Sequence, residues 1–351
     1  MIKKIGILGA GMMSQVGHIP FYYKNPSCEI VAIYETRKSI IDGLKIKYKE
    51  INIIENLDEF INEYIFDGVV ISVPRLTTYN ITRKVLASKT NVIVEKPMSH
   101  TLEDAIKLNN IALKNKLIYS IGYMKRYDPG IIFAKKLFDK INNEKMYGKL
   151  LFSRFYNFSN AYAVNPPEHI RPRESRSDRY EESRSSPEWL PTSYIDKYLW
   201  FMNSASHDIN LINYFFPSEN KIVNKVEINQ NIAISASIEC NEVLIDLNVT
   251  NTKSGVWLEG FHFLYERGSI FVEIPSPMDY NKISKILIND GISNESFSPE
   301  ISDQEWSFSK QANSFIDNLF GFSKPLTDGS SGCLDIELCE KIWAKFFQII
   351  N

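Results

Sequence analysis

The chain contains few cysteines and few histidines, and this scarcity excludes several kinds of site. Its 351 residues include four cysteines and five histidines. No two cysteines form a CxxC pair, and no cluster of cysteine and histidine has the spacing of zinc ligands. We therefore expect no metal site. Cys28, Cys240, Cys333 and Cys339 are interpreted as reduced, buried thiols, which are typical of a reducing compartment.

An excess of one charge and long apolar runs are also missing. The 40 Lys and Arg side chains nearly balance the 42 Asp and Glu side chains, for a net charge of -2. No global basicity therefore indicates a nucleic-acid or membrane partner. No apolar run approaches the roughly 18 residues that a spanning helix needs. Because the chain enters a strand-like run at Met1–Leu8, no room is left for a signal peptide, and we expect a soluble, cytoplasmic protein.

What the chain does have is a hydrophobic content of 44%, enough for two domains with separate cores. Residues 1–124 alternate short apolar runs with helical stretches, which predicts an α/β domain with a doubly wound parallel sheet. The expected strands are Ile5–Leu8, Ile30–Tyr34, Val69–Val73, Val92–Val94 and Ile118–Ile121. The expected helices are Met13–Tyr23, Arg37–Tyr48, Leu57–Glu63, Thr77–Lys89 and Leu102–Lys114.

The pattern changes at about residue 125. A long polar stretch, Asn160–Thr192, is followed by strand-like segments with short polar turns, which predict a mostly antiparallel sheet in an α+β domain of residues 125–351. The expected strands are Lys149–Phe158, Ile222–Asn229, Ile232–Glu239, Val243–Thr250, Val256–Tyr265, Ser269–Ile274 and Ser284–Ile288. The expected helices are Pro129–Phe138, His207–Phe216, Gln304–Leu319 and Leu334–Ile349.

A glycine-rich turn links the first expected strand to the first expected helix. Gly9-Ala-Gly11-Met-Met-Ser14 has one glycine for a tight turn and a second where backbone can approach a pyrophosphate. The pyrophosphate would lie at the N-terminus of the helix. Such a motif is weak alone, but its strand–turn–helix context favours a dinucleotide site. Gly9, Gly11, Met12 and Met13 are therefore candidate cofactor contacts.

An acidic residue ends the second expected strand, 24 positions after Gly11. A carboxylate at Glu35 can bind both ribose hydroxyls of NAD and would repel the 2′-phosphate of NADP. Arg37 keeps NADP(H) possible, because a nearby arginine can meet that phosphate. The sequence therefore favours NAD(H); the alternative is an ordinary surface acid at a strand end.

The expected strand Val69–Val73 ends at the sheet edge where cofactors bind. Ser72, Val73 and Pro74 are therefore candidate cofactor contacts, mostly through their backbone.

Glu95 and Lys96 follow another expected strand and precede Pro97. Oxidation of an alcohol needs a base for the hydroxyl proton while hydride leaves carbon, and reduction uses the same groups in reverse. A lysine can serve when burial or a cationic neighbour lowers its pKa. Pro97 restricts Lys96 to extended conformations and could fix its aim through a cis bond. Glu95 and Lys96 are candidate cofactor contacts; a surface lysine before a turn is the alternative.

These motifs and three more resemble the glucose–fructose oxidoreductase / inositol dehydrogenase / rhizopine catabolism (Gfo/Idh/MocA) family. The motifs, in the family's order, are Ile7-Leu-Gly-Ala-Gly11, Val69-Val-Ile-Ser-Val-Pro74, Val94-Glu-Lys-Pro-Met98, Gly122-Tyr-Met-Lys-Arg126, Ser206-His-Asp-Ile-Asn-Leu211 and Pro325-Leu-Thr-Asp-Gly329. The resemblance implies an NAD(P)-binding Rossmann domain, residues 1–124, and a substrate-binding and oligomerisation domain, residues 125–351. It also implies a nicotinamide cofactor held between the domains, a sugar-type substrate, and a homodimer or homotetramer built on the open sheet.

The resemblance also assigns roles. Lys96 matches the family's catalytic lysine, and His207 matches the histidine that serves as acid or base at the substrate hydroxyl. An aspartate often precedes that histidine by four positions, whereas this chain has Asn203. An amide cannot exchange a proton at neutral pH but can orient a substrate. Asp208 is expected to serve the first turn of its helix, and His18, near the expected cofactor cleft, is interpreted as structural or peripheral.

The stretch of residues 165–191 carries five arginines and no lysine. Guanidinium groups suit bidentate binding of carboxylates or phosphates, which indicates an anionic substrate such as a nucleotide sugar or sugar acid. The alternative is that the six acids of the same segment pair with the arginines. The candidate substrate contacts are Lys125, Tyr162, Arg171 and Arg173.

Three functions remain open from the sequence. The leading one is reversible oxidation of a secondary alcohol on a sugar, cyclitol or nucleotide sugar, with Lys96 and His207 as a proton relay and Asn203 orienting the hydroxyl. The second is an NAD-dependent reaction without net redox, such as glycoside cleavage, elimination or epimerisation. The third, suggested by Asn203, is a catalytically weak NAD(H)-binding sensor or scaffold.

Overall fold

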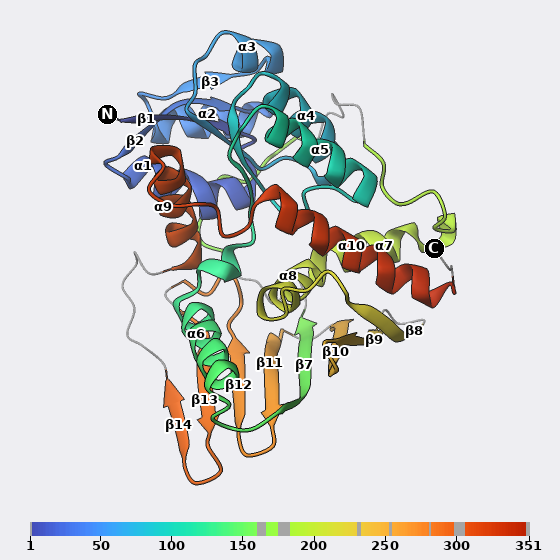
Figure 1. Ribbon diagram of the computed structural model, residues 1–351. Coiled ribbons are helices and arrows are strands. Elements are labelled where there is room, and N and C mark those ends of the chain that lie inside the picture. Colours follow the sequence, from blue (N-terminus) through green and yellow to red (C-terminus); the bar gives the residue numbers. More distant parts are fainter. Residues whose placement is uncertain are drawn as a thin grey trace. The chain divides into compact units, whose positions relative to one another are not determined.

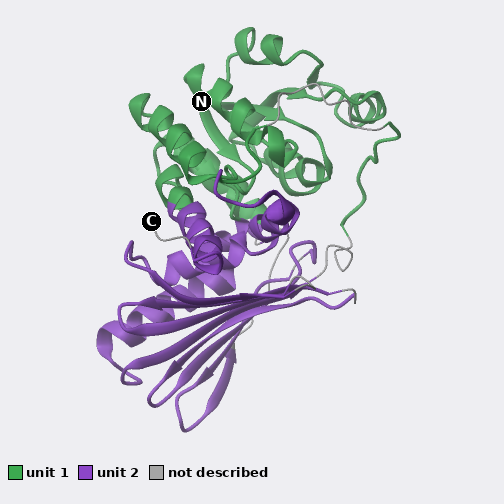
Figure 2. Cartoon of the chain, turned by 90° about the vertical axis from the view of Figure 1, so that its right-hand side faces the viewer, with its two compact units in different colours: residues 1–123, 166–187, 308–333 green, residues 124–165, 188–307, 334–351 purple. Residues whose placement is uncertain are grey.

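The computed structural model describes residues 2–159, 166–174, 183–229, 233–252, 255–280, 282–297 and 306–348. The chain divides into two compact units (Figure 2). Unit 1 comprises residues 1–123, 166–187 and 308–333, and unit 2 comprises residues 124–165, 188–307 and 334–351. The sequence pattern predicts two continuous domains that meet at residue 124. The units are instead interleaved, because two later segments belong to unit 1.

Unit 1 is built on a parallel sheet of six strands in the order β3-β2-β1-β4-β5-β6 (Figure 1). The strands are β1 (Lys3–Leu8), β2 (Cys28–Tyr34), β3 (Asn52–Ile54), β4 (Gly68–Ile71), β5 (Asn91–Val94) and β6 (Tyr119–Ile121). This order is that of the doubly wound dinucleotide fold, with its reversal between β1 and β4. All four residues of the central β4 are buried, as expected of a sheet covered on both faces. The predicted doubly wound domain is confirmed.

The helices of unit 1 follow the predicted alternation, with small differences at their ends. They are η1 (Ser14–His18), α1 (Ile19–Lys24), α2 (Lys38–Lys47), α3 (Leu57–Asn62), η2 (Arg75–Thr77), α4 (Thr78–Ala87) and α5 (Leu102–Lys114). Helical conformation begins at Met12, and η1 is a π-helical interruption of the first helix.

A segment from near the end of the chain completes unit 1. In α9 (Ser307–Phe320), Ala312, Phe315 and Ile316 join the core cluster that includes Ile5 and Ile7 of β1. After α9, residues 327–328 run beside β6, where the amide of Ile121 donates to the carbonyl of Thr327 at 2.8 Å. Apolar burial and sheet pairing therefore both hold this segment in unit 1.

Unit 2 contains an eight-stranded sheet in the order β14-β13-β12-β11-β7-β10-β9-β8. The strands are β7 (Leu150–Ser159), β8 (Ile222–Ile228), β9 (Ala233–Cys240), β10 (Val243–Asn251), β11 (Leu258–Tyr265), β12 (Ser269–Ile274), β13 (Lys285–Asn289) and β14 (Asn294–Phe297). Every neighbouring pair is antiparallel except β7 with β10. The predicted, mostly antiparallel sheet is confirmed.

The helices of the described part of unit 2 lie along one face of this sheet (Figure 2). They are η3 (Met124–Tyr127), α6 (Pro129–Glu144), η5 (Thr192–Tyr194), α7 (Ile195–Ser204), α8 (Ser206–Phe215) and most of α10 (Gly329–Phe346). An aromatic cluster joins α6, α8 and the sheet. The ring of Phe215 lies 4.9 Å from those of Phe261 and Phe263, and the ring of Phe138 lies 4.6 Å from that of Phe263. This packing fixes α8, which carries His207.

Two strands and one α-helix of the described residues are not predicted by the sequence pattern. Strands β3 and β14 have only three and four residues, too few for a clear period. In α7 only Tyr198, Phe201 and Met202 are buried, a narrow stripe that packs Tyr198 and Phe201 on Trp343 of α10. In the described ranges, no helix combines the length and apolarity needed to cross a membrane.

Candidate functional site

The predicted cofactor residues of unit 1 follow the carboxyl ends of neighbouring strands of one sheet. The glycine turn follows β1, Glu35 follows β2, residues 72–74 follow β4, and residues 95–97 follow β5. Because parallel strands end at the same edge, the sheet brings these segments to one side of unit 1. This edge, at the reversal of strand order, is where open α/β sheets bind ligands.

The glycine turn has the geometry of a phosphate cradle. Gly9 has φ of +93°, and a Cβ there would lie 2.3 Å from the carbonyl oxygen of Ser72, so no other residue fits. At Gly11 a Cβ would meet only Arg37 Nη2, at 3.9 Å, so its backbone is open to a ligand. Ser14 Oγ is fully buried and makes no hydrogen bond with a described residue. An open backbone, a helix start at Met12 and a spare hydroxyl fit a pyrophosphate.

Glu35 is a buried carboxylate held by many donors. It is 4% exposed and accepts hydrogen bonds from the amides of Ala10, Thr36 and Arg37 at 2.8–3.2 Å. The Arg37 guanidinium adds Nε at 2.9 Å and Nη2 at 2.6 Å. Burial alone would raise the pKa of Glu35, but the bonds and charge of Arg37 outweigh it and lower that pKa. The group therefore stays ionised and can accept from ribose hydroxyls.

The segment after β4 forms the next part of this edge. The amide of Ser72 donates to the carbonyl of Leu8 at 2.9 Å, which fixes the strand end beside the glycine turn. Ser72, Val73 and Pro74 are half-buried, and Thr77 Oγ1 donates to the carbonyl of Pro74 at 2.8 Å. These residues therefore present partly exposed backbone to the same edge.

Lys96 lies in the loop after β5. The amide of Glu95 donates to the carbonyl of Ile71 at 2.9 Å, so sheet pairing continues to the residue before the lysine. Lys96 is half-buried, and its peptide bond to Pro97 is cis. The Glu95 carboxylate is 2.7 Å from His18 Nε2, so it is turned toward the first helix.

Part of the arginine-rich segment belongs to unit 1. The side-chain amide of Gln15 pairs with both backbone groups of Ile170, at 2.8 and 3.1 Å. At the start of α2, Glu174 accepts from the hydroxyl of Ser39 and from its amide, the latter at 2.6 Å, and these bonds lower the pKa of Glu174 to about 2. Residues 170–174 are thus tied to the glycine-turn helix at one end and to α2 at the other. Arg171 and Arg173 between these ties are exposed.

The alternative is that the arginines pair with acids of the same segment, but Arg184 forms an ion pair with a residue outside it. Arg184 Nη1 is 2.7 Å from Glu103 Oε2 within unit 1. Arg176, Arg179 and the predicted substrate contact Tyr162 lie outside the described residues.

In unit 2 the predicted catalytic residues, the acid/base His207 and the orienting Asn203, lie on consecutive helices. Asn203 is near the end of α7, His207 is the second residue of α8, and Ala205 joins the two helices. Both predicted residues are half-buried. The short connection keeps them close in the chain and on the same part of unit 2.

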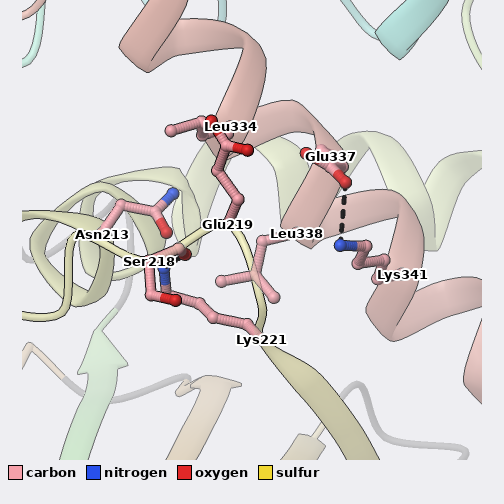
Figure 3. Close-up of a pocket in the computed structure, with 8 residues that line it drawn as sticks. All are labelled: Asn213, Ser218, Glu219, Lys221, Leu334, Glu337, Leu338 and Lys341. Atoms are coloured by element: carbon pink, nitrogen blue, oxygen red, sulfur yellow. Dashed lines mark hydrogen bonds and ion pairs between the residues drawn. The ribbon is translucent and has the colours of Figure 1, made fainter. Parts of the chain in front are cut away.

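A buried polar clamp holds α8. Asp335 of α10 accepts from the side-chain amides of Asn210 and Asn213, each at 2.7 Å, and Asn210 accepts from Arg126 Nε at 2.8 Å. Burial raises the pKa of Asp335 to about 6. A shallow pocket beside the clamp is lined by Asn213 and by the Glu337–Lys341 ion pair (Figure 3). No residue predicted for the site lines it.

Lys125, a predicted substrate contact, is 4% exposed and forms an ion pair with Glu259 of β11. Trp257 Nε1 donates to the same carboxylate at 3.2 Å. Asp208 of α8 lies nearby, with Oδ2 3.2 Å from Asn157 Nδ2. Burial, and then the charge of Glu259, raise the pKa of Asp208 to about 8. The inner sheet face therefore supplies Lys125 with a counter-ion that the sequence pattern does not reveal.

Sequence reasoning missed three contacts of the site in unit 1: His18 with Glu95, Gln15 with Ile170, and Ser39 with Glu174. A histidine one helical turn after the glycine motif was a signal for the first. The other two join residues 155 and 135 positions apart, and no local pattern links such positions.

The first and longest segment of unit 1 matches a known family. Residues 3–123 match the one described as "Oxidoreductase family, NAD-binding Rossmann fold". An uncharacterized oxidoreductase of Schizosaccharomyces pombe is 32% identical over 138 residues, which are 39% of this chain and 38% of that protein. The match thus spans well under half the length of this relative.

Two longer similarities extend beyond unit 1. Inositol 2-dehydrogenase of Salmonella paratyphi B is 24% identical over 250 residues, 70% of this chain and 67% of that protein. The structure of aldose-aldose oxidoreductase from Caulobacter crescentus, complexed with glycerol, has a TM-score of 0.75, covers 99% of this chain and 98% of that chain, and is 15% identical. At that identity the structural likeness shows the fold. Residues 3–123 therefore resemble the NAD-binding Rossmann part of this oxidoreductase family, and the similarity to a dehydrogenase covers 70% of this chain.

Proposed function

We propose that the protein is an NAD(H)-dependent oxidoreductase that moves a hydride to or from a secondary alcohol carbon of a sugar, cyclitol or nucleotide sugar. The observation that carries this proposal is one sheet edge with an open glycine cradle, an ionised carboxylate and a lysine loop. The family match of residues 3–123 and the similarity to proteins named inositol 2-dehydrogenase and aldose-aldose oxidoreductase support the substrate class. When bound, the nicotinamide supplies or accepts the hydride.

The chain's own residues favour NAD(H) over NADP(H). Gly9, Gly11, Met12 and Met13 would hold the pyrophosphate, and Glu35 the adenosine ribose. Arg37 already pairs with Glu35, so a 2′-phosphate would have to displace a carboxylate that repels it. NADP(H) remains possible if Arg37 turns from Glu35 to the phosphate.

For the proton, we assign Lys96 and His207 as the relay. A half-buried lysine after β5 and a half-buried histidine at the start of α8 are both able to exchange a proton with a substrate hydroxyl. Asn203 would hold that hydroxyl by hydrogen bonds and transfer no proton.

An anionic group on the substrate is part of the proposal. Arg171 and Arg173 support it, because their side chains are exposed and the backbone that carries them is tied down on both sides. Lys125 supports it less, since Glu259 is already its counter-ion. Tyr162 stays a candidate contact from the sequence alone.

We also propose a homodimer or homotetramer through the sheet of unit 2. On the sheet face away from the helices, Leu244, Phe152 and Leu264 are neighbours across three strands, and Leu244 and Leu264 are 40% and 41% exposed. A contiguous apolar row on an open sheet fits self-association. Light scattering should give a mass above one chain, and Leu264→Glu should lower it. A monomeric wild type would contradict the proposed homodimer or homotetramer.

The central test measures NADH binding and turnover separately. Titration with NADH should change its fluorescence, and a panel of sugars, cyclitols and nucleotide sugars should be screened for NADH formation or consumption. Isotope exchange at a substrate carbon without accumulation of NADH would favour the reaction without net redox. Failure of NADH and NADPH to bind would overturn the proposal, and binding without any turnover would leave the sensor or scaffold.

A further inference from the structure

We propose that His18 is a positioning residue for Lys96. Through Glu95, it ties the lysine loop to the helix that follows the glycine turn. His18 Nε2 lies 2.7 Å from Glu95 Oε1, although the two residues are 77 positions apart. Because an ionised carboxylate only accepts hydrogen bonds, His18 donates from Nε2. The inference rests on the proposed function, since it gives Lys96 its task.

The His18 ring has little freedom to move. It is 2% exposed and ends the π-helical segment η1, which directly follows the glycine turn. Single π turns inside helices are frequent at functional sites. The ring lies edge-to-face on Phe308 of α9 at 6.4 Å. Phe308 can approach because Gly17 has no Cβ, which would lie 2.8 Å from its ring. Packing against α9 therefore fixes the His18 ring independently of its hydrogen bond to Glu95.

The Glu95 side chain is equally well placed. Its backbone amide is held by Ile71, the last residue of β4. Gly122 leaves room for the side chain, because a Cβ there would lie 3.2 Å from Glu95 Cα and 3.3 Å from Glu95 Oε1. The carboxylate is 14% exposed. Two independent features, the sheet end and the missing Cβ, thus direct it to His18.

Lys96 is held from both sides as a result. On one side is the Glu95–His18 bond. On the other, Pro97 and Met98 are buried, and Met98 Sδ lies 2.5 Å from where a Cβ of Gly332 would be. The lysine backbone is therefore fixed relative to the glycine turn, where the cofactor would rest. A displacement of the order of 1 Å at a reacting group can lower a rate about 100-fold, so loss of the bond should affect Lys96 more than cofactor affinity.

The test measures how readily the Lys96 amine reacts with an acylating reagent. The protein is treated with acetic anhydride with and without saturating NADH, and acetylation of Lys96 is measured by mass spectrometry. Bound NADH should protect Lys96 in the wild type. His18→Ala and Glu95→Ala should lose most of this protection, and in His18→Ala, which does not alter a candidate cofactor contact, the dissociation constant of NADH should change by no more than about threefold. With a substrate from the panel, kcat should fall about 10- to 100-fold with little change in KM.

Three further variants separate positioning from general loosening. His18→Gln keeps a donor near the same place and should restore part of the protection. The double variant should be no worse than either single variant, because the two residues act through one bond. Tyr23→Phe, which removes the Tyr23–Glu50 bond at the exposed end of the same helix, should behave as the wild type. Melting temperatures are measured for each.

The outcomes distinguish the two proposals. A wild type in which NADH binds without protecting Lys96 contradicts the proposed function. A wild type that is protected, with His18→Ala and Glu95→Ala protected equally, overturns the role of His18. So do losses in the single variants that multiply in the double variant. If His18→Ala does not fold, the protection of Lys96 in Glu95→Ala tests the role of His18. This variant should fold, because the Glu95 side chain is partly exposed.

Discussion

Two carboxyl groups, one in each unit, are almost completely buried but have opposite pKa shifts. Glu35 in unit 1 is 4% exposed and its pKa is lowered, whereas Asp208 in unit 2 is fully buried and its pKa is raised to about 8. Burial raises the pKa of both carboxyl groups, so the neighbouring groups decide the direction of the net shift. Glu35 has a guanidinium and three backbone amides. Near Asp208, the Glu259 carboxylate raises the pKa and Lys125 lowers it by less. Asp208 accepts one side-chain hydrogen bond, from Asn157, and its Oδ1 makes no hydrogen bond with a described residue.

This difference distinguishes the sheet edge of unit 1, where we propose that the cofactor binds, from the buried ion pair of Lys125 and Glu259 in unit 2. In unit 1 the charged groups lie at the end of a sheet, where a ligand can replace one of their partners. In unit 2 the ion pair of Lys125 and Glu259 is enclosed on the inner face of the sheet, below α8. Substitutions at this edge of unit 1 should therefore change binding and rate, and those at the Lys125–Glu259 pair and Asp208 should change stability and its pH dependence.

The largest expected effect is at the edge of unit 1. Lys96→Met should reduce turnover about 1,000-fold or more, because the proton of the hydroxyl loses its acceptor. NADH should still bind, since the glycine cradle and Glu35 are untouched. Steady-state kinetics and a fluorescence titration measure the two separately, and retained turnover would contradict the mechanism.

The next effect concerns the buried ion pair of Lys125 and Glu259 in unit 2. Glu259→Gln leaves the buried ammonium of Lys125 without its carboxylate, and should lower the free energy of unfolding by about 3–5 kcal/mol. Chemical denaturation with circular dichroism measures it. The matched control is Lys225→Gln, which removes an exposed ion pair with Glu227 and should cost at most about 1 kcal/mol. If Glu259→Gln and Lys225→Gln lost equal amounts of unfolding free energy, burial of the Lys125–Glu259 pair would not add to its contribution.

A third prediction concerns cofactor choice. Glu35→Gln keeps the shape of the side chain but removes the charge that holds Arg37 and repels a 2′-phosphate. The ratio of NADPH to NADH affinity should rise about tenfold. Titrations with both cofactors measure the ratio. In Glu35→Gln/Arg37→Ala the rise should disappear; a rise that persists would show that Arg37 does not meet the phosphate.

A fourth prediction concerns a pH dependence in unit 2, which is measured as a slope. The folded protein keeps the Asp208 proton up to a pKa of about 8, whereas the unfolded chain releases it near 3.8. The stability from this proton is therefore complete below the unfolded pKa and is lost as pH rises toward the folded pKa, at up to about 1.4 kcal/mol per pH unit. Asp208→Asn should remove this slope. Urea unfolding at several pH values tests it, and an unchanged slope would contradict a protonated Asp208.

Much of the fold could be predicted because its signals are local. The strand–turn–helix around Gly9, the acid after β2 and the proline after Lys96 each lie within a few residues of a strand end. The alternation of β11, with Glu259, Phe261 and Phe263 inward, predicts a strand. It cannot show that the inward carboxylate meets Lys125, 134 positions away. Nor could it show that α9 returns to the core of unit 1 or that Ile170 pairs with Gln15.

By itself, the sequence determined the doubly wound sheet of unit 1, the mostly antiparallel sheet of unit 2, the glycine cradle and the strand ends that carry Glu35 and Lys96. Only the tertiary structure decided which groups meet across the chain: His18 with Glu95, Lys125 with Glu259, and Asp335 with α8. The physical reason is range. Hydrophobic period and turn chemistry act over a few residues, whereas the partner of a buried polar group is set by strand order and helix packing, which no local pattern contains.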